Sequence, residues 1–397
     1  MKAIKSSRIY FEDGVRDGIL VIDQGVFAGF LNPDVSMSNI EDYGNQRIIP
    51  GIFDTHNHGT YGYALNPLPD QTQESIDREI RGYLKALTYE GVTSVFPTCE
   101  PVIIENIARI AEEHLDGAQI LGIHSEGPYL NRVGENGRPM PSPPVDMNVV
   151  HKMVDDARGK LRLVALAPEI EGIHEAMEFF LKHDVKLAFA HSDLKGEGTK
   201  RAIEEGITVA THLSNVMTGL HHRDIGALGT LLTSEKVDCE LICDGLHVSL
   251  DFIKLLLKVK DSSRFMMISD SSELAGLAPG VYDSFWPLPI TVDEQGYLKD
   301  VDGRLCGSSK SVLFGIGNLV EKAGLPLETV IQMASLNPAR VYGVDHKKGS
   351  IALGKDADFV VISDDYQATA TYIKGCCAYN SLKEKRIFNP ELGSIRK

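Results

Sequence analysis

Two histidines separated by one residue, His56 and His58, follow an apolar run that begins at Ile48. Side chains two residues apart point to the same side of a β-strand, so both imidazoles can face one point at the strand's end. Imidazoles that converge in this way are suited to bind one metal ion. A single His-X-His pair is also common among ordinary polar loop residues, so its meaning depends on the rest of the chain.

Further metal-ligand and acid–base residues stand directly after other short apolar runs. They are His124 and Glu126 after 119–123, His191 after 185–190, His212 after 207–210, Asp244 and His247 after 237–243, and Asp270 after 265–269. Each residue alone can be explained without a function: a histidine can be buried in the core with its ring nitrogens hydrogen-bonded, and Asp270 can be a helix N-cap. Five of the eight runs end in His, Glu or Asp at 56–58, 124–126, 191, 212 and 270, and a sixth ends in Asp244 with His247 just beyond. This pattern favours the interpretation that these side chains form one site.

The elements that would position these residues alternate regularly along the chain. Apolar runs short enough for buried parallel strands lie at 48–54, 92–97, 119–123, 161–167, 185–190, 207–210, 237–243 and 265–269. Segments of helical period lie at 71–90, 103–115, 147–157, 173–183, 195–205 and 249–258, with a further one after His222. Eight strand–helix alternations predict a (β/α)8 barrel of the TIM type, whose active site lies at the carboxyl ends of the strands.

The two ends of the chain have a different character from its middle. Residues 1–49 and the segment after Lys348 alternate short apolar stretches with Gly and Asp, which indicates strands and turns. We expect both ends to pair in a small β-sandwich domain of residues 1–49 and 347–397, beside a barrel domain of residues 50–346. Two more helices are expected at 312–323 and 326–336. The proline-rich stretch 138–144 predicts a stiff loop that could belong to a lid.

The composition narrows the class of protein. The chain has 397 residues, of which 43% are hydrophobic and 24% charged, as in ordinary soluble globular proteins. A formal net charge of −15 argues against a protein that binds nucleic acids or the surface of anionic membranes. No signal peptide or membrane-spanning run is evident. Cys376 and Cys377 are adjacent and the six cysteines lack metal-finger spacing, which favours reduced thiols in a cytoplasmic protein.

Histidines and carboxylates at a barrel mouth suit Zn²⁺ or Fe²⁺ with a position left open for water. Such a metal lowers the pKa of its water toward ~7 and polarises a carbonyl, which produces a hydrolytic nucleophile at neutral pH. Asp270 is the candidate to accept the proton of that water and deliver it to a leaving nitrogen. Glu126 is the candidate bridge between two metals, because the fourth strand ends in Ala167-Pro168-Glu169 and offers no lysine for carbamylation.

These motifs resemble those of the amidohydrolase superfamily, and within it those of the N-acetylglucosamine-6-phosphate deacetylases and their relatives. The matching segments, in family order, are 50–59, 122–129, 190–192, 211–215, 219–226, 243–248, 268–270, 305–308 and 337–340. The resemblance implies metal-dependent deacetylation of an N-acetylhexosamine 6-phosphate, with N-acetylglucosamine 6-phosphate as the leading candidate. The alternative is another amidohydrolase that cleaves a different amide or cyclic amide, as dihydroorotases and dipeptidases do.

The resemblance also implies roles for the residues of the barrel mouth. One metal would be held by Glu126, His191 and His212. A second would be held by His56 and His58 with Glu126 shared, so that one or two ions bind per subunit. Asp270 would be the catalytic acid and base. A catalytically silent barrel, used as a metal-dependent scaffold, would be expected to lack Asp270 or several ligands, and the chain has them all.

For the substrate, the resemblance implies a phosphate-binding turn at Asn215 and Val216 and sugar-phosphate contacts from Arg223 and His247. In this family the arginine reaches into the neighbouring subunit's site, which implies a homodimer. Arginine pairs with phosphate through two parallel hydrogen bonds, which agrees with this role. From the residues alone, Arg223 can equally be an exposed arginine at the start of a helix.

The chain departs from the family pattern in three places. Arg138 precedes a proline where relatives usually have a His or Gln that contacts the substrate's amide carbonyl, so either Arg138 takes that role or the loop differs. Ile225 stands where proline is usual, and residues 271–280 are atypical. These departures leave the identity of the sugar and the need for its phosphate open, whereas the metal chemistry is unaffected.

Overall fold

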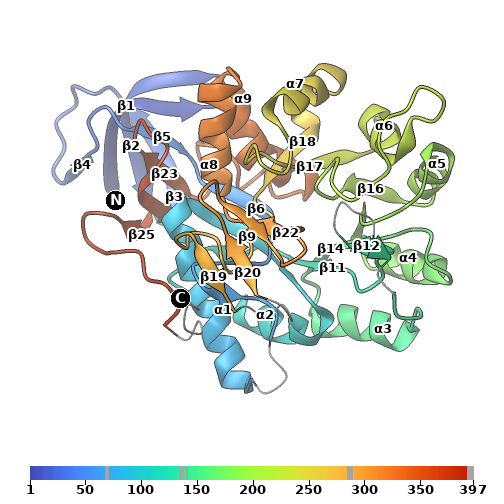
Figure 1. Ribbon diagram of the computed structural model, residues 1–397. Helices are drawn as coiled ribbons and strands as arrows, with labels where there is room; N and C mark the ends of the chain where they lie inside the picture. The colour runs from blue at the N-terminus through green and yellow to red at the C-terminus, as the bar shows by residue number, and fades with distance from the viewer. Residues whose placement is uncertain (68–70, 134–137, 140–141, 284–288, 391–397) are drawn as a thin grey trace.

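A parallel β-barrel forms the centre of the computed structural model (Figure 1), which describes residues 1–67, 71–133, 138–139, 142–283 and 289–390, without the side chains of 133, 138 and 139. Its strands are β6 (Ile52–Asn57), β9 (Val92–Cys99), β10 (Gln119–Ile120) with β11 (Ile123–Glu126), β14 (Leu161–Leu166), β15 (Lys186–Phe189), β16 (Ile207–Ala210), β17 (Asp238–Ile242) and β18 (Phe265–Ile268). They pair in parallel in this order, so all their carboxyl ends meet at one mouth.

Helices surround the barrel on its outside (Figure 1). They are α1 (Gln73–Leu87), α2 (Ile104–Ile110), α3 (Met147–Asp156), α4 (Ile173–Lys182), α5 (Gly196–Glu204), α6 (Gly226–Thr233), α7 (Leu250–Val259), α8 (Val312–Gly317), α9 (Leu327–Ile331) and α10 (Asn337–Val341). Helix α1 illustrates why they form. Thr72 caps it by accepting the Ser75 N–H, and Ile80, Tyr83 and Leu84 turn a buried face toward the strands. The predicted (β/α)8 barrel is confirmed.

The seam between the first and last barrel strands is closed by side-chain contacts and separate backbone hydrogen bonds rather than by a regular ladder. The buried carboxylate of Asp54 on β6 accepts hydrogen bonds from the hydroxyl of Ser269 at 2.6 Å and from the side chain of Asn57 at 3.0 Å. Asn57 also donates to the hydroxyl of Ser271 at 2.9 Å and forms a single bridge with that residue. This polar seam holds the end of β6 against the segment that follows β18.

The two chain ends form one separate mixed sheet, at the upper left in Figure 1. Its strands are β1 (Lys2–Phe11), β2 (Gly14–Asp23), β3 (Val26–Leu31), β4 (Ile40–Asp42), β5 (Arg47–Pro50), β23 (Phe359–Ile362), β24 (Ala368–Ile373) and β25 (Cys376–Asn380). The expected pairing of the chain ends is confirmed, because β23 runs antiparallel to β5 with Val360 opposite Ile49. The domain boundaries at 49/50 and 346/347 stay a prediction.

Several element limits differ from the expectation for identifiable reasons. The run 48–54 divides at Gly51, whose N–H donates to the Asp358 carbonyl, so β5 joins the small sheet and β6 the barrel. Helix α2 ends at Ile110 instead of residue 115. The chain then turns so that Gly117 lies against the backbone of Leu84, where any side chain would clash. The segments 312–323 and 326–336 each begin as an α-helix and continue as a π-helix, at 318–322 and 332–336.

A four-stranded antiparallel sheet between β18 and α8 was not predicted. It contains β19 (Gly280–Tyr282), β20 (Ile290–Val292), β21 (Tyr297–Lys299) and β22 (Leu305–Ser308), drawn in orange in Figure 1. Its apolar side chains, among them Ile290 and Leu298, form a small cluster with Leu274 from the preceding segment. Strand β22 returns the chain to the barrel, where Ser308 forms a bridge with Ser271.

Smaller elements complete the described part of the chain. Two hairpins, β7 (Gly59–Thr60) with β8 (Tyr63–Ala64) and β12 (Arg132–Val133) with β13 (Arg138–Pro139), lie beyond β6 and β11. No helix among the described residues combines the length and apolar character needed to cross a membrane.

A buried ion pair lies in the C-terminal segment that leads into strand β23. The ammonium of Lys348 lies 2.6 Å from the carboxylate of Asp358 and 2.8 Å from that of Asp356. The side chains of Lys348 and Asp358 are each 6% exposed. Asp358 also accepts the backbone N–H of Lys374 at 2.7 Å. Removing one partner of such a pair leaves an uncompensated buried charge.

We therefore predict that Lys348→Met lowers the free energy of unfolding by about 3–5 kcal/mol, because burial raises the pKa of Asp358 and Lys348 is the main partner that stabilises its charge. Denaturant-induced unfolding measures this change. Lys182→Met is the control, because Lys182 pairs with Glu178 at 3.5 Å with both side chains more than 70% exposed, and such pairs contribute little. Equal stability of the two variants would contradict the structural role of the Lys348–Asp358 pair.

Candidate active site

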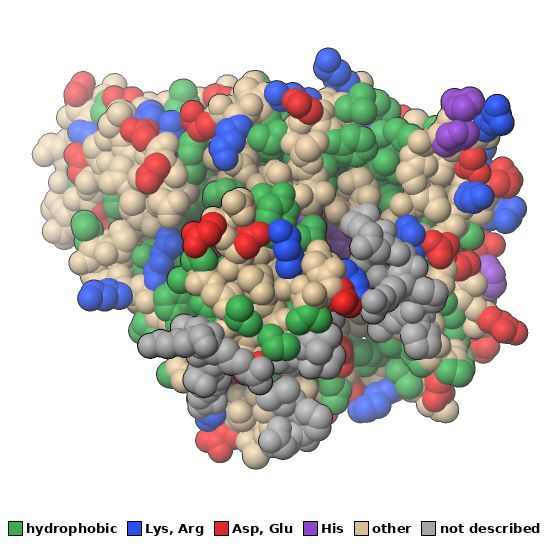
Figure 2. Space-filling model, in the orientation of Figure 1, with side chains coloured by type: hydrophobic (Ala, Val, Ile, Leu, Met, Phe, Trp, Pro, Cys, Tyr) green, Lys and Arg blue, Asp and Glu red, His purple; other side chains and the backbone are tan. Residues whose placement is uncertain are grey.

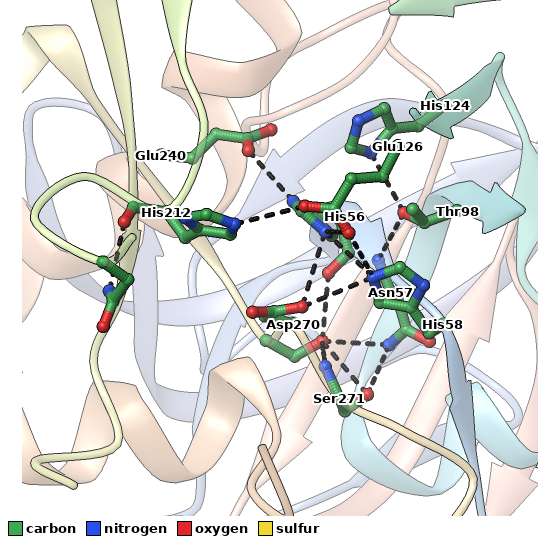
Figure 3. A network of polar contacts seen from close by, with 12 residues as sticks. His56, Asn57, His58, Thr98, His124, Glu126, His212, Glu240, Asp270 and Ser271 are labelled. Atoms are coloured by element: carbon green, nitrogen blue, oxygen red, sulfur yellow. Dashed lines mark hydrogen bonds and ion pairs between the residues drawn. The ribbon is translucent and has the colours of Figure 1, made fainter. Parts of the chain in front are cut away.

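The carboxylate of Glu126, the last residue of β11, lies between two pairs of histidines. Figure 3 shows it near His56, His58 and His212. Its Oε1 atom is 3.1 Å from Nε2 of His191 and 3.1 Å from Nε2 of His212. Its Oε2 atom is 3.1 Å from Nε2 of His58 and 3.6 Å from Nε2 of His56. The five predicted ligands therefore form two groups, each able to hold a metal ion, that share Glu126.

Two of the four histidine rings, those of His56 and His191, are oriented by hydrogen bonds on the nitrogen that faces away from Glu126. Nδ1 of His56 lies 3.2 Å from the buried carboxylate of Glu240, and Nδ1 of His191 lies 2.8 Å from the Arg132 carbonyl. A carboxylate and a carbonyl only accept hydrogen bonds, so each Nδ1 carries the proton and the Nε2 of each ring offers a lone pair. Partners of this kind fix the tautomer of metal-binding histidines.

The residues present fit a pair of divalent cations. Nε2 of His56 and Nε2 of His58 are 3.1 Å apart, and the same atoms of His191 and His212 are also 3.1 Å apart. Nitrogen lone pairs that face each other at this distance repel unless a proton or a cation lies between them. Imidazole nitrogens with one shared carboxylate are ligands that Zn²⁺ and Fe²⁺ accept.

The charges at the mouth act on one another strongly. Burial raises the pKa of the Glu126 carboxyl, but His56, His191 and His212 outweigh it and hold this pKa well below its usual range. Burial lowers the pKa of His58, whereas the carboxylates of Asp270 and Glu126 raise it, with a net pKa of about 9. Because a metal and a proton compete for the same nitrogen, these carboxylates equally favour a bound cation.

Asp270 stands beside the histidine pair of β6, two residues beyond the end of β18. Its Oδ1 atom is 3.4 Å from Nε2 of His56 and 3.5 Å from Nε2 of His58. Burial raises the pKa of this carboxyl, but the neighbouring histidines outweigh it and lower the pKa below its usual value. The Asp270 N–H donates to the His56 carbonyl at 2.9 Å, and its own carbonyl accepts the Ser308 N–H at 2.7 Å.

The backbone is strained at the ends of three barrel strands. His191, His212 and Asp270 have φ angles of 49°, 30° and 49°, in the left-handed region that favours glycine. Residues with side chains adopt such angles at a cost of order 1–3 kcal/mol, and they concentrate at functional sites. The turn after His212 continues this pattern, with Ser214 at 83° and Val216 at 51°. The left-handed bends accompany the contacts of His191 and His212 with Glu126 and of Asp270 with His56 and His58.

The residues predicted to bind substrate have different environments. His247 lies after β17, where its Nδ1 is 2.7 Å from the carboxylate of Asp244. Asn215 is buried in the turn after His212 and donates to the His212 carbonyl at 3.1 Å, and Val216 follows it. Arg223 is exposed on the loop before α6. At that edge of the molecule Figure 2 shows basic side chains and histidines together on the surface.

Arg138 is placed only through its backbone, which pairs with Val133 in the hairpin of β12 and β13. Its side chain lies outside the described part of the structure. The structure thus brings together Asp270 and all five predicted metal ligands. The substrate roles of Arg138, Asn215, Val216, Arg223 and His247 stay predictions.

Two residues of the site were not singled out from the sequence. Glu240 is fully buried on β17 and contacts both His56 and the hydroxyl of Thr55, at 3.2 Å each. Ser308 ends the unpredicted strand β22 and contacts Asp270 and Asp244. A signal for Glu240 was present, because an acid inside the apolar run 237–243 must find a buried partner. Its partner, in contrast, lies on another strand and is visible only in the fold.

Comparison with known proteins agrees with this geometry. A model of the amidohydrolase family matches residues 47–378 of the chain. The N-acetylglucosamine-6-phosphate deacetylase of Bacillus subtilis (strain 168) is 31% identical over 86% of this chain and 86% of that protein. The N-acetylgalactosamine-6-phosphate deacetylase of Escherichia coli O157:H7 is 30% identical over 94% of this chain and 98% of that protein.

A solved structure is similar over almost the whole chain. It is a mutant N-acetyl-D-glucosamine-6-phosphate deacetylase from Mycobacterium smegmatis, in complex with N-acetyl-D-glucosamine-6-phosphate. The two chains are 26% identical and superpose with a TM-score of 0.83, over 95% of this chain and 99% of that chain.

We predict that the purified protein contains two divalent metal ions per chain, because Glu126 offers one oxygen to each histidine pair. His58→Asn should remove about one equivalent, and His191→Asn about one equivalent from the other group. Elemental analysis of the purified variants measures this. His174→Ala is the control, since its side chain on α4 is 65% exposed. Metal content that is the same in all the variants would contradict the assignment of the ligands.

Proposed function

The chain belongs to the amidohydrolase family, and we propose that it hydrolyses the acetamide of an N-acetylhexosamine 6-phosphate to acetate and the hexosamine 6-phosphate. N-acetylglucosamine 6-phosphate is the substrate we propose first. The observation that carries the proposal is the division of the Glu126 oxygens between two histidine pairs, with the Asp270 carboxylate within 3.5 Å of one pair. The names of the similar proteins supply the substrate class.

We propose Zn²⁺ or Fe²⁺ as the ion, held by Glu126, His191 and His212 in one group and by His56, His58 and Glu126 in the other. When bound, the metal would activate a water for attack and polarise the amide carbonyl. The carboxylate of Glu240 and the carbonyl of Arg132 keep His56 and His191 in the tautomer that binds a cation through Nε2.

Asp270 is proposed as the general base and acid of the reaction. Its carboxylate is ionised at neutral pH, so it can accept the proton of the attacking water. The same carboxyl then delivers that proton to the amine nitrogen as the C–N bond breaks, so the base is regenerated in each turnover. Two backbone hydrogen bonds, to the His56 carbonyl and from the Ser308 N–H, hold Asp270 beside the histidines.

Recognition of the substrate is proposed to involve His247, Asn215, Val216 and Arg223. The buried carboxylate of Asp244 accepts the Nδ1–H of His247, which fixes the orientation of that ring for a substrate contact. The exposed position of Arg223 supports the proposal that it serves the site of a neighbouring subunit in a homodimer. Arg138 is retained as the candidate contact to the amide carbonyl.

Sequence identity does not distinguish between the two epimers of the sugar. The relatives named for N-acetylglucosamine and for N-acetylgalactosamine are 31% and 30% identical to this chain. A deacetylation screen over both N-acetylhexosamines, each with and without the 6-phosphate, tests the substrate class and the epimer together. Turnover of neither phosphorylated sugar would reject the proposed function.

We predict that Asp270→Asn lowers kcat on the preferred substrate by about 10²- to 10⁴-fold, because the side-chain amide of an asparagine cannot accept the proton of the attacking water. Steady-state kinetics measures the loss, and metal analysis of the same sample confirms that the ligands remain occupied. Asp251→Asn, with a side chain that is 96% exposed, is the control and should keep its activity. Turnover by Asp270→Asn comparable to that of the parent would reject Asp270 as the base.

We predict that Arg223→Ala raises KM for the phosphorylated sugar by about tenfold or more, because a charged hydrogen bond to phosphate is lost. KM for the unphosphorylated sugar should change little. Arg201→Ala, on α5 and 63% exposed, is the control. An equal loss for both sugars would favour an amidohydrolase with a different substrate.

The same variant tests the homodimer. If Arg223 serves the neighbouring site, a mixture of refolded Arg223→Ala and Asp270→Asn subunits forms heterodimers with one complete site. Activity should then reappear in the mixture although each parent is impaired. A mixture no more active than the sum of its parts would place Arg223 and Asp270 in the same subunit's site.

A further inference from the structure

Ser308, the last residue of the inserted strand β22, contacts two residues of the active site at once. Its side chain is buried, with the residue 1% exposed. The Ser308 N–H donates to the carbonyl of Asp270 at 2.7 Å, and the Ser308 carbonyl accepts the N–H of Ser272 at 3.2 Å. Its hydroxyl oxygen lies 2.9 Å from the Oδ2 atom of Asp244, the partner of His247.

The direction of the hydroxyl bond follows from its surroundings. The Lys310 N–H donates to the Ser308 oxygen at 3.0 Å, so that oxygen already accepts a hydrogen bond. A carboxylate can only accept, so Ser308 donates its proton to Asp244. The other Asp244 oxygen accepts the N–H groups of Leu246 and His247 at 2.8 and 2.9 Å. Asp244 is thus held from both sides.

These bonds fix the state of the His247 ring. Oδ2 of Asp244 accepts two hydrogen bonds, from Nδ1–H of His247 at 2.7 Å and from the hydroxyl of Ser308. Because the carboxylate cannot rotate without losing them, the imidazole keeps its proton on Nδ1 and its plane is held.

We propose that Ser308 is a positioning residue that aligns His247 through Asp244 and holds the backbone of Asp270 through its own N–H. This proposal rests on the proposed function, because it takes His247 as a substrate contact and Asp270 as the acid and base. One residue of the inserted sheet thereby sets the spacing between the group that binds substrate and the group that moves the proton.

The close approach of β22 to Asp270 supports this role. Gly307, which precedes Ser308, has φ of 74°, and a Cβ atom there would lie 3.0 Å from the Asp270 carbonyl oxygen. The apolar cluster that includes Leu274 and Leu298 anchors the inserted sheet to this position. A hydroxyl at residue 308 therefore reaches Asp244 from a backbone that is already fixed against Asp270.

The test is the kinetics of Ser308→Ala on the preferred N-acetylhexosamine 6-phosphate. The variant loses the hydroxyl but keeps the N–H to Asp270, so KM should rise about tenfold while kcat changes less than about threefold. Metal content should stay at the parent's value. Ser308→Cys keeps the volume with a weaker donor and should have an intermediate KM. A fall in kcat and metal content with unchanged KM would overturn the proposal.

A double-mutant cycle with His247→Ala tests the route through His247. If Ser308 acts through this ring, the double variant should have the KM of His247→Ala alone. Additive effects of the two substitutions on KM would overturn the proposal. Ser309→Ala is the matched control, because its buried hydroxyl donates to the Gly296 carbonyl instead of to Asp244, and its KM should equal that of the parent.

A spectroscopic measurement separates this proposal from the proposed function. In ¹H–¹⁵N spectra of histidine-labelled protein, His247 should carry its proton on Nδ1, with exchange about tenfold faster in Ser308→Ala. This measurement needs no turnover. If the protein hydrolysed no N-acetylhexosamine 6-phosphate, the proposed substrate would be rejected, and the exchange rate would still test the role of Ser308. An unchanged Nδ1–H exchange rate in Ser308→Ala would overturn the positioning role.

Discussion

The carboxylate of Glu126 lies among four imidazole rings, and the arrangement of the barrel mouth depends on this contact. Each of its oxygens faces one histidine pair, at 3.1 Å from the nearest nitrogens. The rings come from strands far apart in the sequence, so they meet only because parallel strands end at a common mouth. Electrostatics makes the cluster interdependent, because positive charge at the histidines lowers the pKa of Glu126 while Glu126 raises that of His58.

Holding such a cluster together has a cost in backbone strain. His191, His212 and Asp270 all adopt left-handed backbone angles, which residues with side chains otherwise avoid. The surrounding contacts offset this strain: the polar seam around Asp54 and Asn57 closes the barrel, and backbone hydrogen bonds hold Asp270 from both sides. Preorganised groups of this kind need little rearrangement when charge develops in a reaction.

Parts of the chain outside the barrel strands support the mouth. The small sheet joins β5 to β23 and so ties both chain ends to the strand that precedes His56. The inserted sheet ends at Ser308, which contacts the backbone of Asp270 and the side chain of Asp244. The proposed metal ligands therefore come from the barrel strands and the residues directly after them, whereas contacts to Asp270 and to the Asp244 partner of His247 come partly from the segment between β18 and α8.

The sequence by itself determined the barrel and indicated which histidines and carboxylates meet at its mouth, because a short apolar run that ends in His, Glu or Asp marks the end of a strand. The roles of these residues as metal ligands and as acid and base stay predictions. The sequence also indicated that the chain ends pair. Only the tertiary structure decided what depends on contacts between distant segments: Glu240 as the partner of His56, the seam of Asp54 with Ser269, and the link from Ser308 to Asp244. The inserted strands of three or four residues are too short to show an alternating pattern, and a hydrogen-bond partner leaves no periodic trace in a sequence.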